Sequence, residues 1–351
     1  MEKKIETFRI ETFSWYLGID VGSTQHAYCL YRGKEKVARS FFANSTKGLK
    51  ELLTCLKDHK VEFDKLLSCL EHTGVYGQKV CRVLYGEGST VWLVSAARLK
   101  GVSMEVDRRK TDAVDAEKIG SFAYRFADQC RAYRPESKEL RALKDWCRLR
   151  RQLVNQRVRL VNQRKMFEQQ AIQTLEVGKL YKELIQTYEE QLLQIEQKIN
   201  ALIESTDCWE EQRKWLMSIP GIGSVTARKL LVVTQGFSRM NNHKQLASYG
   251  GTAPFERSSG KHQPKRRISR RADPELKKLL TTAVMCTIKP GGYFHEYYHI
   301  LLKVPGRKPL QAINMLRNRL LKIAVTLVRK KELFDRELYK ENCLSWQEGL
   351  T

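Results

Sequence analysis

Four carboxylates in the N-terminal part of the chain have the types and spacing to bind a divalent metal ion. Asp20 and Glu71 each end an apolar, strand-like run. Asp112 and Asp115 lie three residues apart, so a helix would place both on one face. Carboxylates gathered in one place repel one another unless a cation neutralises them. Because Mg²⁺ prefers oxygen ligands, the set predicts a magnesium site.

Such a site predicts phosphodiester chemistry. Two Mg²⁺ ions, about 3.5–4 Å apart, can clamp the attacking and leaving oxygens of a phosphodiester. We expect two ions, for which Mn²⁺ can substitute. Arg108, Arg109 and Lys110 directly precede the aspartate pair and could contact a DNA backbone. Singly, a strand-end aspartate often only forms a turn, and two aspartates on a helix usually face solvent. The ordered set favours function.

A basic segment further along the chain carries two adjacent hydroxyls. Ser258 and Ser259 precede Gly260, and between residues 254 and 271 seven Lys/Arg residues stand against one Glu. A serine can attack a phosphodiester where cations stabilise the transition state. From the residues alone, a basic surface loop is the commoner explanation. The cations that we expect to contact nucleic acid here are Arg257, Lys261, Lys265, Arg266, Arg267, Arg270 and Arg271.

A Pro-Gly-Ile-Gly turn within residues 215–231 separates two helical runs. Gly221 and Gly223 would expose backbone N–H groups at the start of the second helix, which is a ready site for phosphate. The pattern is typical of the helix–hairpin–helix elements of sequence-independent DNA binders. A plain turn between two helices is the alternative.

The carboxylates must be positioned by an α/β domain, which we expect over residues 13–130. Strands alternate there with helices, the pattern of α/β proteins. In open α/β sheets, ligands bind beyond the carboxyl ends of the strands. A helix against that edge would bring the aspartate pair to Asp20 and Glu71. The expected strands span 16–21, 27–31, 37–42, 66–71 and 90–94, and the helices 45–56 and 77–84.

Two long helical patterns follow, up to about residue 172 and from about 181 to 203. They predict an antiparallel hairpin or coiled coil over residues 137–206. Residues 138–168 hold ten Lys/Arg against three acids, so a dimerisation strut and a nucleic-acid contact are both open. A third, mostly helical domain is expected over 207–335, interrupted by a Gly- and Arg-rich loop.

Composition limits the partners and the compartment. The 351 residues carry a net charge of +24, which favours a polyanionic partner, with nucleic acid as the default. Nine scattered cysteines without a CxxC pair fit a reducing compartment better than disulfides or zinc. The N-terminus lacks the apolar core of a signal peptide, and no apolar run approaches the ~20 residues of a membrane span. We therefore expect a cytoplasmic protein without membrane contact.

Five blocks, in this order and spacing, resemble the DEDD-type insertion-sequence transposases of the IS110 family. The resemblance covers about residues 14–330. The blocks are GIDVGSTQHAYCL, LEHTGVYG, RKTDAVDAEKIG, SIPGIGSVTARKLL and SYGGTAPFERSSGK with its continuation RRISRRADPELKKLL.

The resemblance implies a RuvC-like, RNase H-type N-terminal domain. Asp20, Glu71, Asp112 and Asp115 match the family's Mg²⁺-binding tetrad. It also implies a DNA transposase or recombinase that cuts and rejoins element ends and target DNA. Some family members are guided by a structured RNA from the element itself, so a guide RNA is an expected partner. A homodimer or homotetramer, with a site composed from different protomers, is also expected.

The resemblance places a serine nucleophile in the C-terminal domain. Ser259 matches the family's serine and would form a covalent phosphoserine intermediate, while its neighbour Ser258 is the alternative. The chain departs from the family in the same loop. Thr252 and Ala253 stand in GGTAP where G-L-x-P is frequent, and Ala272 replaces the usual glycine.

Three other functions compete with this prediction. A RuvC-like junction-resolving endonuclease would use the carboxylates without a serine intermediate. An ATP-binding protein of the sugar kinase/actin class shares the first phosphate loop, but its further glycine-rich motifs are missing from the sequence. A non-catalytic nucleic-acid binder would not need all five catalytic positions, which this chain retains.

Overall fold

The computed structural model describes residues 12–72, 74–102, 111–255, 267–268 and 272–337. The chain divides between Glu136 and Ser137 into two compact units, each with its own packing. The two units are described separately below.

The first unit is built on a mixed five-stranded sheet of order β3-β2-β1-β4-β5. The strand β2 is antiparallel to both of its neighbours, β1 and β3, whereas β4 runs parallel to both β1 and β5. The strands lie where the sequence predicted them. Their bounds are β1 Trp15–Val21, β2 Gln25–Arg32, β3 Glu35–Ala43, β4 Leu66–Glu71 and β5 Thr90–Val94.

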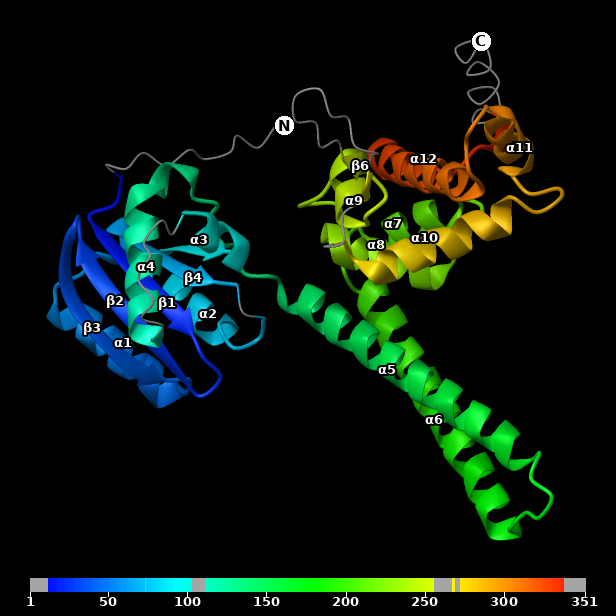
Figure 1. Cartoon of the computed structure of the whole chain (residues 1–351), viewed down its shortest axis with the longest axis horizontal. Coiled ribbons are helices and arrows are strands. Elements are labelled where there is room, and N and C mark those ends of the chain that lie inside the picture. The colour runs from blue at the N-terminus through cyan, green and yellow to red at the C-terminus, as the bar shows by residue number, and fades with distance from the viewer. Residues whose placement is uncertain (1–11, 73, 103–110, 256–266, 269–271, 338–351) are drawn as a thin grey trace. The chain divides into compact units, whose positions relative to one another are not determined.

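Helices cover both faces of this sheet (Figure 1). On one face, Leu17 and Ile19 of β1 share a core with Leu52 of α1 and Leu84 of α2. On the other face, Tyr16 packs in a core with residues of α4. The arrangement is consistent with the expected RuvC-like fold. The helices are α1 Thr46–Asp58, α2 Gln78–Gly86, α3 Ala96–Val102 and α4 Asp112–Arg125, with short 3₁₀ turns η2 Phe63–Lys65 and η3 Ala127–Gln129.

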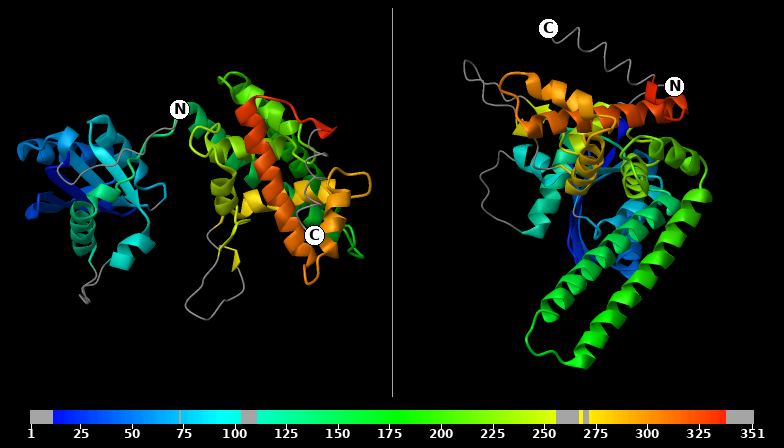
Figure 2. Two further views of the ribbon diagram at one scale, coloured as in Figure 1. Left: turned by 90° about the horizontal axis from the view of Figure 1, so that it is seen from above. Right: turned by 90° about the vertical axis from the view of Figure 1, so that its right-hand side faces the viewer.

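The second unit begins with two 30-residue helices, α5 (Lys138–Phe167) and α6 (Leu175–Glu204). They pack along each other as a hairpin (Figure 2). We expected α5 to reach about residue 172 and α6 to begin near 181, and both limits were wrong. The ring centroids of Phe167 and Tyr181 lie 5.8 Å apart across the two helices. The first residues of α6, which include Gly178, are therefore packed against the end of α5.

The base of the hairpin shares one hydrophobic core with the remaining helices. Leu143 of α5 and Ile199 and Ile203 of α6 are fully buried in it, together with Leu316 and Leu320 of α12. The other elements are α7 Trp209–Met217, α8 Ser224–Thr234, α9 His243–Tyr249, β6 Pro254–Phe255, β7 Arg267–Ile268, α10 Pro274–Thr287, α11 His295–Lys303 and α12 Pro309–Lys330. Of the helices in the described ranges, none is long and apolar enough to span a membrane.

Candidate functional site

Two glycines allow α4 to lie directly on β1. A Cβ atom added to Gly18 of β1 would lie 2.2 Å from the Gly120 nitrogen and 2.3 Å from the Ala116 carbonyl oxygen, both in α4. A Cβ added to Gly120 would lie 2.6 Å from the ring of Tyr31. No side chain larger than hydrogen fits, so the helix backbone rests on the strand. Sequence reasoning missed this pair, although a glycine in a buried strand signals such an approach.

The strands bring Asp20 and Glu71 to the same edge of the sheet. β1 and β4 are parallel neighbours, with Ile19 paired to Leu70, so the two acidic residues follow side by side at the carboxyl ends. Both side chains are half-buried. This edge is where open α/β sheets place their ligands.

The start of α4 supplies the other two carboxylates. Asp112 and Asp115 occupy its first turn, as predicted, and the Thr111 side chain caps the helix by accepting from the Val114 N–H at 3.4 Å. The positive end of the helix dipole favours acids there. Lys118, one turn on, lies 3.6 Å from an Asp115 carboxylate oxygen. Sequence reasoning did not single out this lysine.

Electrostatics show that the four carboxylates share one neighbourhood. The pKa of Asp20 is raised to about 6, first by burial and then by the charges of Asp112, Asp115 and Glu71. A backbone hydrogen bond from Val21 acts in the opposite direction. Folding therefore holds negative charges together at a cost that a cation would relieve.

The donor set fits Mg²⁺ better than a transition metal, because it consists of carboxylate oxygens alone. Within the ranges described, however, no three His, Cys, Asp or Glu side chains are close enough to hold one ion together. A cation would have to draw the carboxylates inward from their present positions. The metal-binding role of the tetrad stays a prediction.

Several predicted site residues lie outside the described residues. They include both candidate nucleophiles, Ser258 and Ser259, and the side chain of Arg267 in β7. The remaining members of this group are Arg108, Arg109, Lys110, Arg257, Lys261, Lys265, Arg266, Arg270 and Arg271.

The two ends of the serine-bearing segment are held together. Pro254 pairs with Ile268 and Phe255 with Arg267, in the short antiparallel ladder of β6 and β7. The Asp273 N–H also donates to the Tyr249 carbonyl at 2.8 Å. The described residues on either side of 256–266 therefore lie at neighbouring positions in the helical unit.

The predicted glycine turn joins α7 to α8. Gly221 has a φ of +86°, and a Cβ added there would lie 2.5 Å from the Ala283 carbonyl oxygen of α10. Gly223 is the residue before α8 and is exposed. Ile219 and Ile222 bury their side chains beneath the turn. The geometry requires glycine at position 221, whereas Gly223 has an ordinary extended backbone with nothing among the described residues within 4 Å of a Cβ. The contact of both glycines with nucleic acid stays a prediction.

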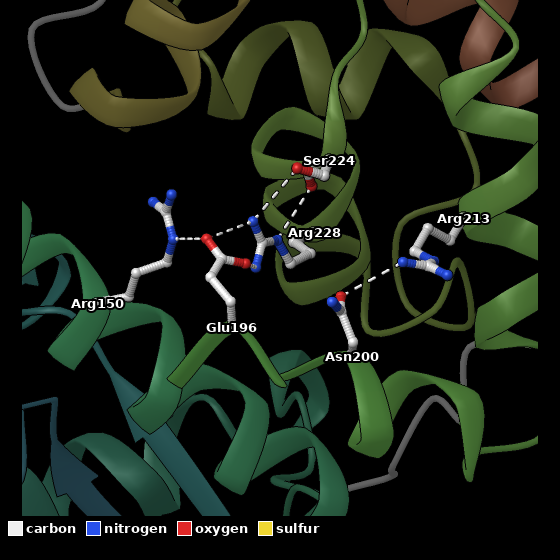
Figure 3. Close-up of polar contacts among 6 residues, drawn as sticks. All are labelled: Arg150, Glu196, Asn200, Arg213, Ser224 and Arg228. Carbon is white, nitrogen blue, oxygen red and sulfur yellow. Dashed lines mark hydrogen bonds and ion pairs between the residues drawn. The ribbon is translucent and has the colours of Figure 1, made fainter. Parts of the chain in front are cut away.

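A charged network fixes α8 to the hairpin base (Figure 3). Arg228 of α8 is only 3% exposed and forms an ion pair with Glu196 of α6, which also accepts from Arg150 of α5. Arg228 donates as well to the Ser224 carbonyl at 3.2 Å. Burial raises the pKa of Glu196, but the hydrogen bonds from the two arginines outweigh it and lower the pKa overall.

Comparisons with known proteins match both parts of the chain to the same kind of protein, a transposase. A transposase family with the DEDD motif of IS110 matches residues 17–170, and the "Transposase IS116/IS110/IS902 family" matches residues 213–299. The chain is also similar to the pilin gene-inverting proteins of Moraxella bovis and Moraxella lacunata. Each is 25% identical over 332 residues, covering 93% of this chain and 99% of the relative.

Proposed function

The chain belongs to the IS110 family of transposases and is a DNA transposase or recombinase, and from this premise we propose how it acts. We propose that it cuts and rejoins DNA with a Mg²⁺-binding carboxylate site and a serine nucleophile. The observation that carries the proposal is that Asp20 and Glu71 lie side by side at one sheet edge, near enough to Asp112 and Asp115 for those charges to raise the pKa of Asp20. The relatives are named for inverting a pilin gene, which supports a reaction that both breaks and rejoins strands.

The tetrad would hold the metal. When bound, the ions would stabilise negative charge on the phosphate oxygens. Without them, Lys118 offsets part of the charge of Asp115. The burial of Asp20 lowers the local dielectric response, which strengthens any attraction between the carboxylates and a cation.

The covalent step is assigned to Ser259, with Ser258 as the alternative. The serine oxygen forms a bond to phosphorus, and the bond from phosphorus to one deoxyribose oxygen breaks. The leaving oxygen takes up a proton, while the serine loses one. A phosphoserine link to one DNA end results, and attack by a deoxyribose hydroxyl of another strand reverses it. No net hydrolysis occurs, so the ends can be rejoined.

The partners beyond DNA are also proposed. The basic hairpin suits a structured guide RNA, because α5 carries all ten Lys/Arg residues of the range 138–168. The hairpin also exposes the apolar side chains of Val158, Leu180 and Leu193. These would support pairing of copies into a homodimer or homotetramer.

A covalent trapping assay tests the proposal. The purified protein, Mg²⁺, DNA from the flanks of its gene and co-expressed RNA are combined and separated on a denaturing gel. We expect a protein–DNA adduct that is lost in Ser259→Ala and weakened in Asp20→Ala. Adduct loss in Ser258→Ala alone would move the nucleophile by one residue.

Cleavage without an adduct, unaffected by both serine substitutions, would overturn the serine step. It would favour the junction-resolving endonuclease, which uses the same carboxylates. Nucleotide binding in a simple ATP titration would instead favour the kinase-like alternative.

A further inference from the structure

The entrance to the serine-bearing segment is clamped to α12. Thr252 is fully buried, and its hydroxyl donates to the Asn318 side-chain oxygen at 2.5 Å. Its carbonyl accepts from the side-chain amides of Asn314 at 2.6 Å and Asn318 at 3.1 Å. Two asparagines one helical turn apart thus hold a single residue between α9 and β6. A leucine at this position could not make the side-chain hydrogen bond.

Arg317 belongs to the same cluster and is a buried cation with no acidic partner among the residues that the structure describes. Its side chain is 8% exposed, and its Nη1 group donates to the Asn314 side-chain oxygen at 3.3 Å. Its buried Nε has no hydrogen-bond partner within the ranges described. Burial alone lowers the pKa of Arg317, with no carboxylate acting against it.

Comparison with Arg228 shows how unusual this is. Both arginines are more than nine-tenths buried in the same helical unit. Arg228 is paired with Glu196 and donates to Ser224, so its charge is compensated. Among the described residues, Arg317 instead donates to one neutral group, the side-chain amide of Asn314. Burying an ion without a counter-charge is costly, and proteins rarely keep such a group without a use.

We propose that Arg317 binds a phosphodiester group of nucleic acid beside Thr252. Asn314 accepts from the Nη1 group of the guanidinium, whereas the buried Nε has no acceptor among the described residues. The Nε edge of an arginine binds phosphate oxygens with charge-assisted hydrogen bonds. An anion is the complement that the cluster lacks, and phosphodiesters are the anions that a DNA recombinase meets. The assignment rests on the proposed function only for the choice of ligand.

The proposal predicts opposite effects on stability and on binding. Arg317→Met keeps the length of the side chain and removes an uncompensated buried charge. We expect its melting temperature without nucleic acid to equal or exceed that of the unchanged protein. Arg228→Met is the matched control, and its melting temperature should fall because Glu196 loses its buried partner. A clear fall for Arg317→Met and also for Arg317→Gln would mean that the arginine is structural and would overturn the proposal.

Binding is measured by titrating labelled duplex DNA with the full chain at several salt concentrations. Arg317→Met should weaken binding roughly 10- to 100-fold. The slope of log K against log salt should fall by about 0.9, the value for one phosphate contact. Arg317→Lys keeps the charge and should retain the slope while losing part of the affinity. Unchanged affinity and slope in Arg317→Met would overturn the proposal.

DNA and RNA offer the same phosphodiester, so the titration is repeated with the co-expressed RNA. A loss with one of the two ligands assigns the site to that nucleic acid. The readout is binding and needs no strand cleavage. A protein that forms no adduct and cuts no DNA would therefore count against the proposed function. The binding data for the Arg317 variants test the phosphate site separately.

Discussion

Asp20 is the residue of the candidate metal site whose raised pKa links the stability of the fold to pH. An unfolded aspartate has a pKa near 3.9, and folding raises that of Asp20 to about 6. The folded state therefore favours the protonated form. The group is neutral in both states well below pH 4. Stability is lost as the pH rises from about 4 through about 6, and above that range the loss stays constant because the group is ionised in both states.

Asp20→Asn should consequently stabilise the metal-free protein at pH 8 by about 1–2 kcal/mol, after allowance for screening by solvent. The gain should vanish near pH 3.5. Addition of Mg²⁺ should raise the melting temperature of the unchanged protein more than that of the variant. Thermal unfolding with and without Mg²⁺ measures this. Asp58→Asn, which alters an exposed aspartate, should change little, and destabilisation by Asp20→Asn at pH 8 without metal would contradict the prediction.

At the scale of elements, the contact of α4 with β1 decides whether the aspartate pair reaches the sheet edge. A Cβ atom at position 18 would lie only 2.2 Å from the Gly120 nitrogen. Gly18→Ala must therefore move the helix backbone, and we expect a loss of about 2–4 kcal/mol in unfolding free energy.

Denaturant unfolding tests this prediction. Gly86→Ala is the control, because nothing lies within 4 Å of a Cβ there and alanine favours helix. It should leave stability unchanged or slightly increased. Equal effects of the two substitutions would show that α4 does not rest on the strand as described.

Substitution of Glu196 tests whether its ion pairs stabilise the packing of the hairpin against α8. Glu196→Ala leaves Arg228, 3% exposed, without its counter-charge. We expect a loss of about 3 kcal/mol. Glu189 lies two turns before Glu196 on α6 and forms an exposed ion pair with Arg157 of α5. Glu189→Ala removes this pair and should cost less than about 1 kcal/mol. Unfolding free energies that differ little between these two variants would contradict the network.

At the scale of the whole molecule, the net charge of +24 governs association with DNA. If about six phosphates are contacted, affinity for duplex DNA should fall on the order of 10³-fold between 50 and 200 mM salt. Fluorescence anisotropy of a labelled duplex measures it. Asp20→Asn should retain this binding, because the tetrad would act on the metal and not on the phosphate charge. A salt-independent affinity would contradict electrostatic binding.

The sequence by itself determined the order and type of the five strands and of the helices α1, α2 and α4 in the first unit, whereas α3 was not predicted. Local alternation of apolar residues marks strands such as 66–71, and the Ser45 cap marks the start of α1, because these signals depend only on neighbouring residues. The order of Asp20, Glu71, Asp112 and Asp115 and the family's motifs were readable in the same way. The end of α5 and the start of α6 were not, because they depend on how the two helices pack, as at Phe167 and Tyr181, and not on neighbouring residues alone.

Only the tertiary structure decided which distant residues meet. The approach of Gly18 to Gly120, the pairing of Glu196 with Arg228 and the isolation of Arg317 join residues that lie far apart in the chain or depend on what surrounds them. Nothing local distinguishes Arg317 from Arg319, two residues away on α12. Burial and the absence of a counter-charge are properties of packing, so an uncompensated cation becomes visible only once the helices surround it.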